Sequence, residues 1–152
     1  VFFVGSDKGR LELLIDIYIK LTELGLKCEF YVTDVPEEKQ RYKNEIKYNH
    51  RLSYEEVLQH AMSSKCILEV LQDEQNYCSI RTIEAIQLKK KLLTTNKHIY
   101  KQRYYRPEII QVIQEVANID MDFFNYLVDE DVYDNLDIGD FKYVADFLVK
   151  NI

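Results

Sequence analysis

The segment with the most specific chemical potential is Ser79-Ile80-Arg81-Thr82-Ile83-Glu84, which follows a polar loop and opens an amphipathic helix. Ser79 is expected to cap this helix, leaving free amide groups at its start, and Arg81 adds a forked cation in the first turn. Glu84 lies three residues after Arg81, so both side chains can share one helical face. The arrangement suits a nucleoside diphosphate, with the amides and Arg81 at the phosphates and Glu84 accepting hydrogen bonds from a ribose diol. An Arg81–Glu84 ion pair on the helix surface fits the same spacing equally well.

A second candidate is the turn Gly5-Ser6-Asp7-Lys8-Gly9-Arg10, which separates an apolar run from a Leu-rich helix. Glycines let backbone N–H groups approach a phosphate closely, and Lys8 or Arg10 would favour negative charge at the helix N-terminus. The turn lacks both the Walker pattern and the full GxGxxG fingerprint. A plain strand-to-helix turn with solvated charges therefore explains it equally well.

These two segments belong to a chain that alternates between β-rich runs and helical periodicity. A capping box at Ser53 and Glu56 marks the start of one of the helices. The strands are expected at residues 1–4, 28–32, 46–48, 65–70, 91–95 and 109–113, and the helices at 10–24, 53–62, 79–88 and 141–149. Such alternation predicts an α/β fold, namely a Rossmann-like parallel sheet flanked by helices.

In open parallel sheets, ligands bind outside the carboxyl ends of the strands. The loops that leave those ends are expected at residues 5–9, 33–36, 71–78 and 96–100. Both candidate segments lie at this edge, so the topology would bring them together.

Composition limits the classes of partner. The net charge of −6 argues against a broad nucleic-acid surface, although a few local cations could still hold a small anion. The basic run at residues 89–91 is expected to be a solvated helix end, and the acidic stretch at residues 129–140 a solvated loop. The apolar runs are shorter than the ~20 residues that span a bilayer.

Cysteine and histidine usage indicates neither a disulfide framework nor a metal site. Cys28, Cys66 and Cys78 form no CxxC pair and are odd in number, which is typical of a reducing cytoplasm. The three histidines share no metal-ligand spacing. The chain also opens directly in a strand-like run. We therefore expect residues 1–152 to be a single domain from a longer protein that has a preceding N-terminal domain.

Three stretches carry a family resemblance. Phe3-Val4-Gly5-Ser6-Asp7-Lys8-Gly9-Arg10 is similar to a strand, glycine and Lys-Gly turn, and residues 79–85 with 90–96 are similar to a donor-site helix and its next strand. In these stretches the chain resembles the C-terminal, donor-binding domain of GT-B glycosyltransferases of bacterial capsule and lipopolysaccharide synthesis. The position eight before Glu84 is Asn76, where that family has a second glutamate.

The resemblance implies a site for a nucleotide-sugar donor, with a UDP-sugar favoured. In it Glu84 would bind the ribose, Lys8 and Arg10 would lie near the diphosphate, and Arg51 with Leu52 would border the nucleobase. The full set of implied donor-binding residues is Gly5, Lys8, Arg10, Arg51, Leu52, Ser79, Ile80, Arg81 and Glu84.

The implied reaction is transfer of a sugar to a saccharide or lipid-linked acceptor, without a metal or separate cofactor. The N-terminal domain would supply the catalytic base, so no catalytic residue is assigned and residues 1–152 alone are expected not to turn over. The enzyme would be cytoplasmic, with peripheral association at the inner face of the membrane compatible with its acceptors. Two alternatives stay open: a non-enzymatic α/β interaction module, and a Rossmann domain that binds NAD or SAM, for which Asp34 would follow the second strand.

Overall fold

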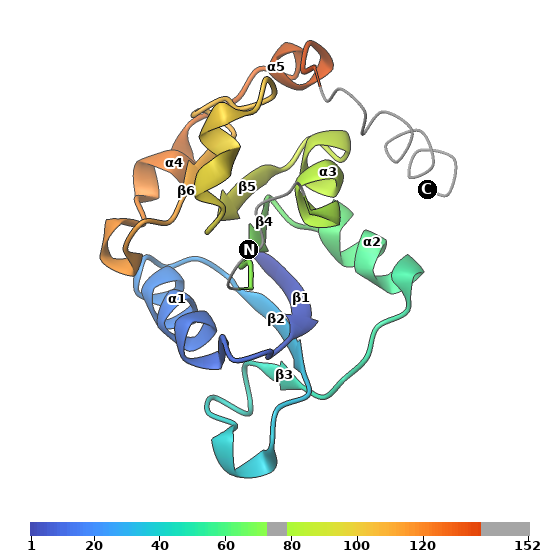
Figure 1. The fold of residues 1–152 in the computed structure, drawn as a ribbon, viewed down its shortest axis with the longest axis vertical. Coiled ribbons are helices and arrows are strands. Elements are labelled where there is room, and N and C mark those ends of the chain that lie inside the picture. The colour runs from blue at the N-terminus through green and yellow to red at the C-terminus, as the bar shows by residue number, and fades with distance from the viewer. Residues whose placement is uncertain (73–78, 138–152) are drawn as a thin grey trace.

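The computed structural model describes residues 1–72 and 79–137, which form a six-stranded, fully parallel sheet with helices on both faces (Figure 1). The strand order is β3-β2-β1-β4-β5-β6. The strands are β1 (Phe2–Ser6), β2 (Glu29–Thr33), β3 (Lys47–Tyr48), β4 (Cys66–Glu69), β5 (Lys91–Thr94) and β6 (Ile110–Val112). The predicted Rossmann-like α/β fold is therefore confirmed.

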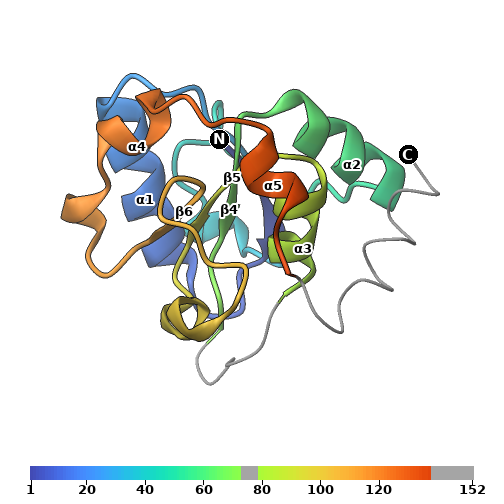
Figure 2. The same cartoon turned by 90° about the horizontal axis from the view of Figure 1, so that it is seen from above.

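The longer helices are divided between the two faces of the sheet. Helix α1 (Leu11–Glu23) covers one face, while α2 (Tyr54–Ser63) and α3 (Ile80–Gln87) cover the other, as Figure 2 shows along the sheet. The short helices α4 (Met121–Asn125) and α5 (Asp131–Asp134) extend these two layers. Three 3₁₀ turns complete the described elements: η1 (Glu37–Lys39), η2 (Lys97–Lys101) and η3 (Val116–Asn118).

Each face has its own hydrophobic core because successive strand residues point to opposite sides. Phe3, Phe30 and Leu93 pack under α1, whereas Phe2, Ile67 and Leu92 pack under α2 and α3. Strands β1, β4 and β5 are covered on both faces, which explains why they appear in the sequence as apolar runs rather than alternating ones.

Local sequence signals account for where the helices begin. The capping box forms as predicted, since Ser53 Oγ accepts from the Glu56 N–H and the Glu56 carboxylate accepts from the Ser53 N–H. Gly25, just after α1, has a φ of +77°, a conformation that glycine adopts without steric cost. No described helix has the length and apolar character needed to cross a membrane.

Three sequence predictions need correction. Gly5 and Ser6 belong to β1 rather than to the loop after it. Only part of the basic run is a solvated helix end: Lys89 is exposed just after α3, whereas Lys91 begins β5, is 9% exposed and donates to the carbonyls of Phe123 and Tyr126. The stretch expected as an acidic loop contains α5, whose Tyr133 is buried against the α2–α3 core. The helix predicted at residues 141–149 lies outside the described residues.

Candidate functional site

The candidate site lies outside the carboxyl ends of β1 and β4, where the strand order reverses. From β1 the chain proceeds outward to β2 and β3, and from β4 it proceeds in the opposite direction to β5 and β6. The first turns of α1, α2 and α3 all lie at this edge, because each helix follows a parallel strand. A topological switch of this kind is the usual ligand crevice of an open α/β sheet.

Arg10 spans the switch point. Its Nε and Nη2 groups donate to the Ser6 carbonyl at the end of β1, at 3.2 and 3.0 Å, and Nη1 donates to the Val70 carbonyl just after β4. Burial lowers the pKa of Arg10, while the carboxylates of Asp7 and Glu69 act in the opposite direction. The guanidinium therefore ties the two strand ends together and carries its charge into the crevice.

Gly5 makes room for this guanidinium. A Cβ atom at Gly5 would lie 2.9 Å from Arg10 Nη2 and 3.2 Å from the Phe3 ring, both closer than ordinary carbon contacts. The Phe3 ring also lies 5.7 Å from the guanidinium carbon, at cation–π distance. A larger residue at position 5 would therefore force the Arg10 guanidinium to move.

The turn between β1 and α1 is tight and partly capped by its own carboxylate. Lys8 and Gly9 have φ values of +45° and +82°, so the Lys-Gly pair makes the left-handed bend. Asp7 Oδ1 accepts from the Leu11 N–H at 2.9 Å and so satisfies one of the amide donors in the first turn of α1. Lys8 is exposed to solvent beside this turn.

A buried carboxylate that sequence reasoning missed organises the other side of the crevice. Glu69, the last residue of β4, is 3% exposed and accepts hydrogen bonds from the hydroxyls of Ser79, Thr82 and Thr94. The Thr82 bond is 2.8 Å long. Glu69 therefore fixes the N-terminus of α3 onto the ends of β4 and β5. The available signal was a single acidic residue inside the apolar run Cys-Ile-Leu-Glu-Val.

Ser79 is the N-cap of α3, as predicted, with its hydroxyl accepting from the Arg81 N–H at 3.0 Å. Ile80 begins the helix and is 45% exposed, so its side chain faces solvent at the crevice rim. Because Ser79 also donates to Glu69, its hydroxyl attaches the first turn of α3 to the end of β4.

Arg81 and Glu84 form the ion pair that their spacing allows, but the pair is not on the surface. The Glu84 side chain is fully buried and that of Arg81 is 21% exposed. Burial raises the pKa of Glu84, and the neighbouring Arg81 acts to lower it. Glu84 Oε1 is buried without a hydrogen-bond partner in the described part of the chain. A buried carboxylate oxygen in that state can accept a hydrogen bond from a ligand.

Tyr54 covers this pair from the start of α2. Burial raises the pKa of Tyr54 to about 12, and the adjacent Glu84 carboxylate contributes to the rise. The ring is nevertheless 39% exposed, so one side faces Glu84 and the other faces solvent. Sequence reasoning missed Tyr54, which stands next to the recognised cap Ser53 and carries no signal of its own.

The structure brings together only part of the predicted donor site. Arg10 lies within electrostatic reach of Glu69, and Glu69 is bonded to the capping serine of the helix that carries Arg81 and Glu84. Arg51 is exposed and pairs with Asp34 at 3.2 Å, while Leu52 packs against the α2–α3 core. Within residues 1–72 and 79–137, no hydrogen bond or ion pair joins Lys8 or Arg51 to these groups. Asn76 and Cys78 lie outside the described residues.

Comparisons with known proteins add no identification. No family model, no curated protein and no solved structure matches this chain. The function must therefore be argued from the site itself.

Proposed function

We propose that this chain is the donor-binding domain of a glycosyltransferase and that it holds a nucleoside diphosphate sugar at the carboxyl edge of its sheet. The observation that supports the proposal is the buried Arg81–Glu84 pair in α3, with one carboxylate oxygen unpaired. Helix N-termini and guanidinium groups are the usual partners of phosphate. A role in bacterial capsule or lipopolysaccharide synthesis, with a saccharide or lipid-linked acceptor, rests on the sequence resemblance alone.

In this proposal the two arginines have different tasks. Arg81 pairs with the donor diphosphate from the first turn of α3, and Arg10 holds the β1 and β4 ends that form the floor. As the sugar leaves, negative charge develops on the diphosphate, and fixed cations and amides stabilise it. The chemistry needs a group that removes the acceptor proton, which we assign to an N-terminal domain.

Glu84 would bind the ribose through the oxygen that lacks a partner. Because Tyr54 covers the carboxylate, the nucleoside must displace the Tyr54 ring, which is already 39% exposed. The ribose hydroxyls would then donate to the Glu84 carboxylate, replacing the phenol as its partner. The net gain is a donor for Oε1, the one carboxylate oxygen without a hydrogen-bond partner in the described chain, which favours the bound state.

A different nucleotide cofactor is the second candidate, and one observation favours it. Asp34 directly follows β2, which is the position where dinucleotide-binding folds with this strand order carry the carboxylate that binds ribose. Here, however, Asp34 pairs with Arg51, and the β1–α1 turn lacks the glycine fingerprint. A thermal-shift comparison of NAD, SAM and UDP would separate the two candidates.

Calorimetric titration with UDP, GDP and ADP tests the proposal directly. We expect one nucleotide to bind the wild type and the Arg81→Ala, Glu84→Gln double variant to lose at least about tenfold in affinity, the effect of one charge-assisted hydrogen bond. Arg103→Ala is a matched control, since Arg103 forms an exposed ion pair with Asp137 at 3.2 Å. The proposal fails if none of the three nucleotides binds, or if the double variant binds like the control.

A further inference from the structure

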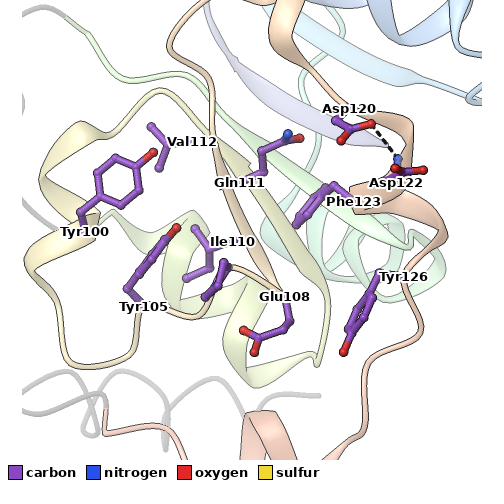
Figure 3. Close-up of a pocket in the computed structure, with 11 residues that line it drawn as sticks. Tyr100, Tyr105, Glu108, Ile110, Gln111, Val112, Asp120, Asp122, Phe123 and Tyr126 are labelled. Atoms are coloured by element: carbon purple, nitrogen blue, oxygen red, sulfur yellow. Dashed lines mark hydrogen bonds between the residues drawn. The ribbon is translucent and has the colours of Figure 1, made fainter.

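A groove of about 570 Å³ lies along the free edge of the sheet, away from the residues of the proposed donor site. All three residues of β6 line it, and β6 is the last strand in the sheet order. Figure 3 shows its walls: Tyr100 and Tyr105 on one side, Phe123 and Tyr126 on the other. The volume is within the range of ligand sites, so the groove can hold several residues of a partner.

Val112 is the one residue of β6 with both backbone groups available for further pairing, since the Ile110 N–H donates to the Arg106 carbonyl. The Ile109 carbonyl accepts from the Leu92 N–H and the Ile113 N–H donates to the Thr94 carbonyl, so the odd-numbered residues bond to β5. In a parallel ladder alternate residues face opposite sides. The N–H and C=O of Val112 therefore point away from β5 and toward the groove. An antiparallel strand can bond to both of these groups at once.

The walls of the groove come from opposite faces of the sheet. Tyr105 and Val112 pack with the α2–α3 core, whereas Phe123 belongs to the α1 core. Lys91 fixes the second wall, because its ammonium donates to the Tyr126 carbonyl at 2.7 Å and lies 4.9 Å from the Phe123 ring centre. Alternate side chains of an added strand would meet these two aromatic walls in turn.

The charge of the groove selects the partner. Among the described residues that line it, Glu108, Asp120 and Asp122 are acidic and none is basic. Glu108 Oε2 and Gln111 Oε1 are buried and have no hydrogen-bond partner in the described chain. Each can therefore accept a hydrogen bond from a bound partner. A second copy of this edge would bring like charges together, which disfavours self-pairing. The carboxylates are also spread out, and the described residues contain no cluster that could hold a metal ion.

We propose that this groove binds an extended, basic segment of a partner protein, which adds to β6 as a seventh strand. The partner's backbone pairs with Val112, its apolar side chains contact the aromatic walls, and its lysine or arginine side chains donate to Glu108 and Gln111. This interaction is independent of the proposed nucleotide site, since the two share no residue.

The test uses a capped pentapeptide in which lysine or arginine alternates with valine, titrated into isotopically labelled protein by NMR. We expect shifts confined to the groove, slower hydrogen exchange of the Val112 amide, and affinity that falls with added salt. Val112→Pro removes the N–H that faces the groove without removing a bond to β5, and proline is tolerated at such edge positions. We expect this variant to bind at least about tenfold more weakly, while Val112→Ala keeps the N–H and stays close to wild type.

Two controls test whether charge contributes to peptide binding. Asp122 is exposed and Glu108→Gln keeps the size of the side chain, so the Glu108→Gln, Asp122→Asn double variant should fold normally and still bind the basic peptide more weakly. A peptide of the same pattern with glutamate in place of the basic residues should not bind. The inference is overturned if the basic peptide fails to bind, if it binds Val112→Pro as well as Val112→Ala, or if a neutral trisaccharide such as cellotriose occupies the groove instead.

Discussion

Gly5→Ala offers a direct test of the close packing at the switch point. The added methyl group would lie 2.9 Å from Arg10 Nη2, so the guanidinium must withdraw from the crevice. Withdrawal breaks the bonds from Arg10 to the Ser6 carbonyl and weakens the one to Val70. The variant therefore tests whether Arg10 stabilises the fold by linking the ends of β1 and β4.

The magnitude follows from the contacts that are lost. A hydrogen bond from a charged group contributes about 1.5–3 kcal/mol, and an alanine in a strand gains about 0.5–1 kcal/mol over glycine. We expect Gly5→Ala to lower the free energy of unfolding by about 2 kcal/mol. A domain of this size is stable by about 5–15 kcal/mol, so the variant should fold and its loss should be measurable.

A double-mutant cycle with Arg10→Ala isolates the cause. Without the guanidinium the new methyl meets only the Phe3 ring, so Gly5→Ala should cost about 0–1 kcal/mol, which gives a coupling energy of about 1–2 kcal/mol. Urea unfolding followed by circular dichroism supplies all four free energies. Gly25→Ala is the control, because φ is +77° there and no atom lies within 4 Å of the new Cβ, so its cost should not depend on Arg10. Equal cost of Gly5→Ala in both backgrounds would refute the reasoning.

Three further predictions concern Glu84, Lys91 and Tyr54. Burial raises the pKa of Glu84, so its ionised form destabilises the folded state at neutral pH. As the pH falls through the raised pKa, the free energy of unfolding of the wild type, measured in urea titrations, should rise relative to that of Glu84→Gln. The same pH dependence of stability in both proteins would contradict this. Lys91→Met leaves one buried carbonyl (Phe123) and one partly buried carbonyl (Tyr126) without their donor. We expect it to cost about 2–3 kcal/mol and to speed amide exchange in α4; unchanged exchange there would show that Lys91 does not anchor this helix. Tyr54→Phe removes the phenol that faces Glu84 and should cost about 1 kcal/mol in urea unfolding, whereas a gain in stability would show that the phenol does not support the carboxylate.

Sequence reasoning predicted the fold well because each strand and helix has a local cause. The capping box at Ser53, Gly25 after α1 and the apolar run of β4 each specify an element boundary within one or two residues. Strand order was less accessible, since it depends on long-range pairing such as that of Phe2 with both Glu29 and Ile67. The sequence therefore predicted a parallel sheet but no strand order, and the return of β4 to the other side of β1 was not predicted.

The candidate site was predictable only where its chemistry is local. Arg81 and Glu84 share a helical face because of their spacing, but spacing carries no information on burial, and the pair is buried rather than exposed. Glu69 and Tyr54 could not be assigned from sequence, because their partners lie 10 to 30 residues away and on other elements. Arg51 was assigned through family resemblance, and in the structure it instead pairs with Asp34 at the exposed rim.

The buried Glu84 is more readily explained by binding than by stability. An unpaired carboxylate oxygen costs folding free energy, and Arg81 offsets only part of that cost, since the net effect on the Glu84 pKa is a rise. An apolar residue of similar size would pack at this position in α3 without that penalty. A group that opposes folding, that lies at the carboxyl edge of a parallel sheet and that is covered only by a half-exposed tyrosine has the properties of a binding residue. If Glu84→Gln loses both nucleotide binding and the pH-dependent loss of folding stability, then Glu84 contributes to binding at the expense of stability. If only the cost is lost, the carboxylate lowers stability without contributing to binding, and the proposed role of Glu84 in holding a nucleotide is refuted.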